Sequence, residues 1–236
     1  DYENRNRTYS NADIDLFYNG KDPWEHPNSD WVGDLIADWT TTSKHNVTLD
    51  GGSNGMYYYV SLGYKNEEAI YKQESTNYKQ YNVRAKLEIP ITDWLKTSVD
   101  YAGFLTSRLY PTKSAGAVYG QSQRLVPTQW SFWPNGKPGP DIEYGDNPVV
   151  TSTLETGTDD AKDYINQTTF RATVTPPMIK GLVLDAYFTY DVTNGYRKRF
   201  QKPWTLYFPI WDSAVRGSDG YITSMDLTPT KRGVAS

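Results

Sequence analysis

The stretch GMYYYVSLGYKNE, residues 55–67, decides the fold because apolar and polar side chains alternate along it. One face of this stretch collects Met56, Tyr58, Val60, Leu62 and Tyr64. The other face collects Tyr57, Tyr59, Ser61, Gly63 and Lys65. A period of two predicts a β-strand. Because only one face is strongly apolar, that face must look either at a protein core or at lipid.

The same alternation recurs along the chain and predicts three hairpins. Their tight connections are residues 51–55, 90–93 and 176–181. If the strands alternate in direction, all three tight turns fall at one end of the sheet. The opposite end then receives the long connections, of which the longest covers about residues 110–162. Outer-membrane barrels separate short periplasmic turns from long extracellular loops in this way, so the pattern favours lipid over a core.

Two further features of the strands bear on this choice. The polar side chains that follow Gln80 at every second position suit a water-filled lumen better than a surface in bulk solvent. Trp94 stands beside a short turn. It suits a periplasmic aromatic girdle and a core position closing a hairpin equally well.

Composition excludes several classes of protein. The chain has 236 residues and a net charge of −4, which offers no basic footprint for nucleic acid. It contains no cysteine and only two histidines, so we expect no disulfide, no metal site and no cofactor. No apolar run is long enough for a transmembrane helix, whereas transmembrane strands need only about ten alternating residues. Aromatic residues make up 15% of the chain, which is typical of both lectins and outer-membrane barrels.

Four segments carry a resemblance to a known family. They are HPNSDW at residues 26–31, KHNVTLDGGSNGMYYYVSLGYKNEEAIY at 44–71, NYKQYNVRAKLEIPITDWLK at 77–96 and IKGLVLDAYFTYD at 179–191. In order and spacing they resemble the barrel region of SusC/RagA-like TonB-dependent transporters, over about residues 10–195. Thr48 and Ser29 stand where the family usually has Ser and Thr, which are conservative exchanges.

The resemblance implies a location, an activity and partners. Such proteins are importers in the bacterial outer membrane of Bacteroidetes, with multi-pass barrels of about twenty-two strands and a plugged lumen. They take up oligosaccharides, or in some cases peptides, together with a SusD-like surface lipoprotein. The TonB complex acts on a plug region that we do not find in this sequence. About six strands cannot close a barrel, so we expect a fragment of a longer chain, lying in the lipid bilayer.

We therefore expect an all-β section of a large transmembrane β-barrel, with about six antiparallel strands in three hairpins. Residues 1–43 would be a polar segment with short helices at the barrel mouth, residues 44–196 the barrel strands, and residues 197–236 an extracellular loop region. Ser10 or Asn11 is suited to cap the first of two N-terminal helices and Asp30 the second, and a third helix is expected at about residues 114–124. The second helix would present Trp31, Leu35, Ile36 and Trp39 on one face.

The long loops hold the candidate substrate-binding residues, because planar rings stack on sugar faces and carboxylates bind hydroxyl groups. These candidates are Trp130, Trp133, Tyr144, Asp141, Asp146, Trp204 and Trp211. The alternative for each residue is packing of loop on loop. Asp141, Glu143 and Asp146 approach calcium-loop spacing but lack the closing glutamate, which favours a polar turn.

No constellation for catalysis is found, so we do not expect an enzyme. Asp185 and Asp191 share the polar face of one strand, where neither has the apolar pocket that a glycosidase acid requires. Two alternatives to the importer remain: a soluble carbohydrate-binding β-domain with aromatic loops, and a structural or adhesin-like surface domain. Both require that the apolar strand faces interdigitate in one dry core.

Overall fold

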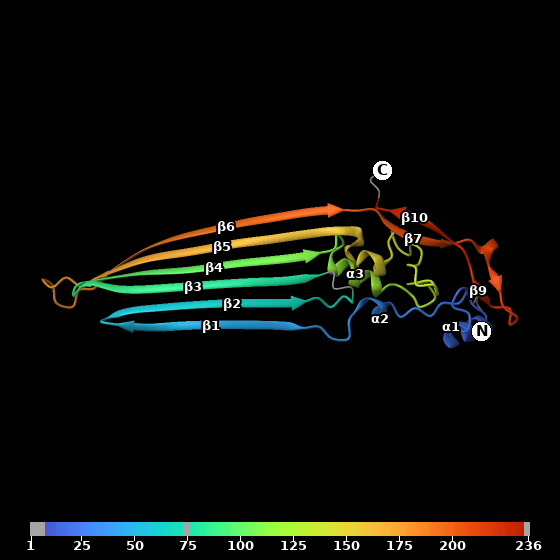
Figure 1. The fold of residues 1–236 in the computed structure, drawn as a ribbon, viewed down its shortest axis with the longest axis horizontal. Helices are drawn as coiled ribbons and strands as arrows, with labels where there is room; N and C mark the ends of the chain where they lie inside the picture. The colour runs from blue at the N-terminus through green and yellow to red at the C-terminus, as the bar shows by residue number, and fades with distance from the viewer. Residues whose placement is uncertain (1–7, 73–75, 234–236) are drawn as a thin grey trace, which may run out of the picture.

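The computed structural model describes residues 8–72 and 76–233, so residues 1–7 of the expected N-terminal segment lie outside the described residues. Six antiparallel strands form one sheet in chain order. They are β1 (Thr42–Ser53), β2 (Met56–Glu68), β3 (Asn77–Thr92), β4 (Leu95–Tyr110), β5 (Gly157–Val174) and β6 (Leu184–Gln201). Figure 1 shows a long sheet with the helices and remaining strands gathered at one end. The predicted all-β section with three hairpins is confirmed.

Short turns close the other end of the sheet (Figure 1). Between β1 and β2 the turn residues Asn54 and Gly55 have φ angles of 51° and 80°. Two successive positive φ values are typical of the type I′ turn, for which Asn-Gly is the preferred pair. Asp93 and Trp94 join β3 to β4, and residues 175–183 join β5 to β6. The long loop expected at about residues 110–162 occupies residues 111–156.

Three helices begin at the residues that the sequence suggests. Ser10 caps α1 (Asn11–Asn19) in a capping box with Asp13. Its backbone hydrogen bond to Asp13 lowers the pKa of that carboxyl group. Asp30 caps α2 (Trp31–Leu35), and Ser114 caps α3 (Ala115–Ser122). The loop end also contains α4 (Pro148–Thr151), η2 (Leu154–Thr156) and η3 (Trp211–Ser213).

The predicted face of α2 is wrong in its second half. The helix ends at Leu35, and Ile36 is extended and forms a β-bridge with Tyr71. Trp39 is therefore outside the helix and 77% exposed. A tertiary contact with a distant loop overrides the local helical pattern here, as it commonly does for weak helix signals.

The C-terminal segment folds as two small hairpins beside the long loop. Strand β7 (Trp204–Pro209) pairs with β10 (Leu227–Arg232), and β8 (Val215–Arg216) pairs with β9 (Ile222–Ser224). Both pairs lie at the loop end in Figure 1. No helix within the described ranges is long and apolar enough to cross a membrane.

The buried core of the molecule lies in the loops and not under the sheet. One cluster of buried side chains comprises Trp31, Leu35, Tyr71, Val118, Val149, Val150 and Leu206. A second comprises Trp24, Trp133, Ile222 and Met225. Among the described residues, the six-stranded sheet adds only Ala161 to the buried hydrophobic set. The sheet thus has no dry core of its own.

Strand register gathers the apolar side chains of all six strands on one face. Leu49 pairs with Val60, Val60 with Ala85, and Ala85 with Tyr101. A second series runs from Tyr58 through the partners Leu87, Val99, Phe170 and Phe188. We call this side, on which Val60 and Phe188 lie, the apolar face. Many of its large hydrophobic side chains are exposed: Val47, Leu49, Tyr58, Val60, Leu62, Leu87, Val99, Phe170, Leu184, Phe188 and Tyr190.

Candidate functional site

The long loop between β4 and β5 is held in shape by one buried amide. Asn147 is fully buried, and its Nδ2 donates to the carbonyl oxygens of Trp130, Ser131 and Pro140 at 3.2–3.3 Å. Its Oδ1 accepts from the backbone N–H of Val149 at 3.1 Å and so caps α4. Because buried carbonyl groups are costly to leave unpaired, this single side chain fixes where Trp130 and its neighbours stand.

Four tryptophans from three parts of the chain form a continuous stack, which we call the indole stack. The ring centroids of Trp24 and Trp133 are 5.9 Å apart, and those of Trp133 and Trp130 are 4.8 Å apart. Trp211 adds a tilted ring 6.4 Å from Trp130. The Nε1 of Trp133 donates to the carbonyl of Tyr207 at 2.9 Å. The stack therefore joins the N-terminal segment, the long loop and the C-terminal hairpins.

The stack changes from buried to exposed along its length. Trp133 is 2% exposed, so in this conformation its faces are occupied by the neighbouring rings. Trp211 is 47% exposed. Trp130 is half-buried between these two rings. An aromatic surface for a ligand is thus available at the Trp211 end, where stacking on a sugar or a peptide side chain is geometrically open.

The other predicted site residues have different surroundings. Trp204 packs against the buried cluster around Leu206. Tyr144 is 92% exposed at the tip of a tight turn, with a φ of 53°. Asp141 accepts a hydrogen bond from Arg232 at 2.8 Å, and Asp146 forms an ion pair with Lys113. Within the described residues, no ring contact joins Trp204 or Tyr144 to the indole stack.

The acidic turn near Asp146 is a network of ion pairs. Arg124 donates to both carboxylate oxygens of Glu143, at 3.0 and 2.8 Å, and this pairing raises the pKa of the guanidinium. Asp141 and Asp146 have the basic partners named above. A β-bridge between Glu143 and Asp146 closes the turn. The polar-turn interpretation accounts for all three carboxylates.

Sequence reasoning missed a cluster beside α1. Asp22 is 1% exposed, and its Oδ2 lies 2.9 Å from the Nδ1 of His26. The Nε2 of His26 is 3.4 Å from a carboxylate oxygen of Asp13. Possible ligand atoms of Asp22, Glu25 and His26 lie within 4.8 Å of one another. The i, i+3, i+4 spacing in DPWEH was the available signal, and it was weak because Asp13 is distant in sequence.

Glu25 connects this cluster to the far end of the chain. Its two carboxylate oxygens accept hydrogen bonds of 3.0 and 2.7 Å from Arg216. These bonds lower the pKa of Glu25. Since both oxygens of Glu25 and one oxygen of Asp22 already have partners, the geometry fits an internal ion network between the two segments better than a metal site.

The apolar face of the sheet ends at a definite line near the loops. A row of residues paired in register crosses five strands there, and we call it the rim row. It comprises His45, Tyr64, Tyr81, Leu105 and Tyr164. Tyr64 and Tyr81 have ring centroids 5.1 Å apart. One step closer to the loops, the same face carries Ser43, Asn66, Lys79, Ser107 and Lys162.

The opposite face of the sheet is polar and carries its own ion pairs. Arg84 of β3 binds Asp100 of β4 through hydrogen bonds of 3.3 and 2.8 Å. Glu88 lies between Lys86 and Lys96, with N···O distances of 2.7 and 2.6 Å. Hollows on this face are lined mainly by hydroxyl, amide and charged groups. One sheet therefore separates an apolar environment from an aqueous one.

A single twisted sheet of this kind, apolar on one side and polar on the other, is a section of a large transmembrane β-barrel. No family model matches the chain. TonB-dependent receptor P26 of Formosa agariphila is 29% identical to it over 214 residues, which cover 87% of this chain and 20% of that protein. The chain thus spans about a fifth of the length of this curated relative.

Solved structures give the same result. The RagAB peptide transporter superposes with a TM-score of 0.58 and 25% identity, covering 77% of this chain and 22% of that chain. The RagAB peptide importer in the closed-closed state superposes with a TM-score of 0.62 at 22% identity, over 84% of this chain and 24% of that chain. This second likeness concerns the fold alone. The chain is similar to part of a SusC/RagA-like TonB-dependent transporter, as its sequence motifs predicted.

Proposed function

We propose that this chain is part of an outer-membrane, TonB-dependent importer that takes up oligosaccharides or peptides together with a SusD-like surface lipoprotein. The observation that carries the proposal is the exposed apolar face ending at the rim row. Residues 164–174 of β5 match the roughly ten residues that a tilted strand needs to cross the hydrocarbon layer. The likeness to a TonB-dependent receptor and to the RagAB peptide transporter supports it.

The two faces of the sheet define its orientation in this proposal. The apolar face contacts lipid, and the face with Arg84 and Asp100 lines the water-filled lumen. The short turns are periplasmic and the loop end is extracellular, as in other outer-membrane barrels. Trp94, which is exposed beside a short turn, belongs to the periplasmic aromatic girdle. The alternative position for Trp94, in a core, finds no support because no core forms beneath the sheet.

Substrate contact is proposed for the exposed end of the indole stack. Trp211 and Trp130 present ring surface there. Asp141, Tyr144 and Asp146 surround the neighbouring turn, which Asn147 ties to Trp130. Indole faces stack on sugar rings and on peptide side chains, so the two substrate classes are alternatives for one surface. The RagAB protein is described as a peptide transporter.

The orientation is tested by labelling single cysteines, because this segment has no native cysteine. Phe188→Cys on the apolar face and Thr189→Cys on the opposite face form a matched pair of neighbours. A spin label at position 188 of the full-length protein in bilayers is expected to collide with oxygen. A label at 189 is expected to collide with a water-soluble nickel chelate. Equal exposure of both labels to the chelate contradicts the membrane assignment and favours a soluble carbohydrate-binding domain.

A further inference from the structure

Two lysines flank a serine immediately beyond the rim row. Lys79 of β3 pairs in register with Ser107 of β4, and Ser107 pairs with Lys162 of β5. Since Tyr81, Leu105 and Tyr164 are two residues further along the same strands, all three lie on the apolar-face side of the sheet. The Cα atoms of the two lysines are about 10 Å apart, as expected across two strand spacings.

The positive charge of these lysines is largely uncompensated. Lys79 is exposed and forms no ion pair with any described residue. Lys162 has only a 4.0 Å contact with Asp160. Asp160 is itself paired in register with Lys198, a further exposed lysine. Among the described strand residues, Glu68 on β2 is the other acidic residue on this side of the sheet near the rim row. Two flexible ammonium groups can therefore converge over Ser107.

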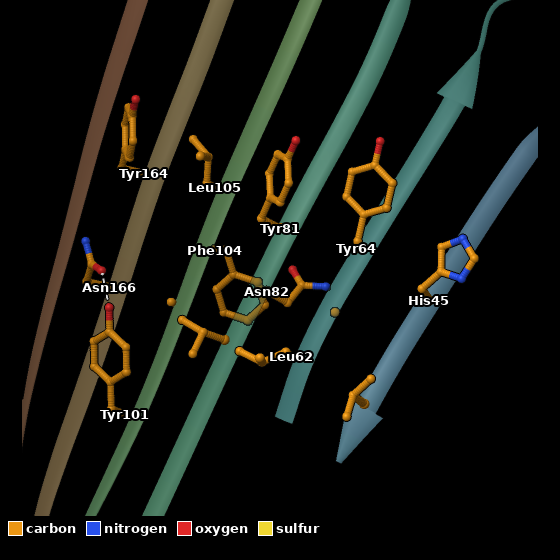
Figure 2. A pocket seen from close by; sticks show the side chains of 14 residues that line it. His45, Leu62, Tyr64, Tyr81, Asn82, Tyr101, Phe104, Leu105, Tyr164 and Asn166 are labelled. Carbon is orange, nitrogen blue, oxygen red and sulfur yellow. Dashed lines mark hydrogen bonds between the residues drawn. The ribbon is translucent and has the colours of Figure 1, made fainter. Parts of the chain in front are cut away.

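An apolar hollow of about 530 Å³ opens directly below the lysines, across the rim row. Figure 2 shows Tyr64, Tyr81, Leu105 and Tyr164 standing over it. Its floor is at Gly103, where an added Cβ would lie 2.9 Å from Val83 and 2.8 Å from the Tyr101 hydroxyl. The hydroxyl of Tyr101, also on this floor, donates to the Oδ1 of Asn166 at 2.7 Å (Figure 2).

We infer that this surface is a binding site for a phosphate-bearing membrane lipid. The lipid phosphate lies over Ser107 between Lys79 and Lys162, and an acyl chain fills the hollow above Gly103. The site has the two parts that such a lipid requires, a cationic pair and an apolar groove. The lysines lie nearer the loop end, where the phosphate would be, and the groove lies further into the apolar face, where the acyl chain would be. This inference rests on the proposed function, which gives the apolar face its contact with lipid.

The lysine charge and the apolar groove contribute separately to lipid binding, and two variants test them one at a time. Each lysine near an anionic lipid surface contributes to the free energy of binding, so removing two is expected to weaken lipid binding roughly thirtyfold. Lys79→Ala combined with Lys162→Ala removes the charge and leaves the hollow intact. Gly103→Leu adds an apolar side chain at the floor of the hollow, where it displaces the side chains of Val83 and Tyr101, and leaves both lysines in place. Lys21→Ala combined with Lys180→Ala is the matched control, because both residues are exposed lysines away from the rim row.

The experiment is native mass spectrometry of the full-length transporter titrated with phosphatidylglycerol, with lipid A and with zwitterionic phosphatidylcholine. We expect the double lysine variant to bind both phosphate-exposing anionic lipids roughly thirtyfold more weakly than the wild type and the control do. Gly103→Leu is expected to lose these lipids as well. Binding of phosphatidylcholine should be equal in all four proteins. The two anionic lipids distinguish a phospholipid from a glycolipid occupant.

Two outcomes overturn the inference. One is unchanged binding of anionic lipids by the double lysine variant. The other is full displacement of lipid by inorganic phosphate together with normal binding by Gly103→Leu, which would indicate a simple anion site. Outer-membrane fractionation of the same proteins distinguishes a failure of the lipid-site inference from a failure of the proposed function. A protein that is in the outer membrane but lacks lysine-dependent lipid binding refutes only the lipid site, whereas a soluble protein refutes the function.

Discussion

Glu25 and Arg216, which lie 191 residues apart, hold the N-terminal and C-terminal segments together through hydrogen bonds of 3.0 and 2.7 Å. The contact is between side chains at the loop end, where the core of the molecule is. Its two-bond geometry makes it more specific than a single surface ion pair.

This pair predicts a pH-dependent stability of the loop end. Arg216 lowers the pKa of Glu25 below its ordinary value of 4.5, so the folded state favours the ionised carboxyl group. The stabilisation is therefore complete above about pH 5 and is lost as the pH falls through the folded-state pKa. Arg216→Ala should lower the melting temperature only slightly at pH 7, because the pair is partly exposed and screened by solvent. Thermal unfolding of the full-length protein, followed by near-ultraviolet circular dichroism, measures this.

The variant and the wild type should converge in acid. At pH 3.5 the difference in melting temperature between them is expected to shrink, since protonated Glu25 no longer binds Arg216 as an anion. Arg171→Ala, a change in an exposed strand residue, is the control. A difference that stays constant from pH 7 to pH 3 would show that Arg216 acts through packing alone.

Asn147→Ala should disorder the long loop. The change leaves the carbonyl groups of Trp130, Ser131 and Pro140 without their amide donor and removes the cap of α4. The expected cost is about 2–3 kcal/mol, typical of breaking a buried hydrogen-bond network. Limited proteolysis within residues 111–156 checks it. Asn135→Ala, at an exposed turn, should leave cleavage unchanged, and equal cleavage of the two variants would contradict the role given to Asn147.

Loss of Trp211 should affect substrate binding, whereas loss of Trp133 should affect stability. Trp211→Ala is expected to weaken substrate binding about tenfold while leaving stability nearly intact, because the ring is exposed at the end of the stack. Trp133→Ala should cost about 3–5 kcal/mol of stability, as for other buried aromatic residues. Calorimetric titration with oligosaccharide and with peptide pools, beside thermal unfolding, separates the two effects.

An exposed tryptophan outside the stack supplies the control for that comparison. Trp39→Ala should alter neither binding nor unfolding, since the ring is 77% exposed and stacks on no aromatic ring of the described residues. Normal binding by Trp211→Ala to both substrate classes would move the contact surface away from the indole stack.

An added positive charge should destabilise the protein on the apolar face of β6 and be tolerated on its polar face. Phe188→Arg places a cation on the apolar face near the middle of the band and should cost about 2–4 kcal/mol. Thr189→Arg, one residue on, lies on the polar face of the sheet and should be nearly neutral. The yield of heat-modifiable, folded barrel in the outer membrane measures both. Equal yields would mean that the apolar face does not contact lipid.

The sheet could be predicted from sequence because its information is local. Period-two alternation in residues 55–67 indicates the two faces, and the tight connection predicted at residues 51–55 is found as a turn at Asn54 and Gly55. The side chains that oppose one another across strands follow from those turns. The same reasoning offered Ser10, beside Asn11, and Asp30 as caps and placed the start of α3 near Ser114, since a helix start depends on residues only a few positions apart.

The loop end could not be predicted in the same way because its contacts join distant segments. Nothing near Trp133 in sequence indicates that Trp24 and Trp130 cover its two faces. The pairing of Asp22 with His26 is local, but its link through Glu25 to Arg216 is not. Aromatic and acidic residues in the loops indicate which region can bind other molecules. They do not indicate which individual side chains pack inside the loops and which are exposed to a ligand.

The indole stack also gives the molecule an optical property. Rings held 4.8–6.4 Å apart couple electronically, so their strong far-ultraviolet transitions split into a circular dichroism signal of paired signs. Because Trp24 and Trp211 come from segments other than the long loop that holds Trp130 and Trp133, undocking of either ring would change that signal. Motion of the N-terminal or C-terminal segment relative to the long loop would thus be recorded spectroscopically, without a dye, by residues already in place.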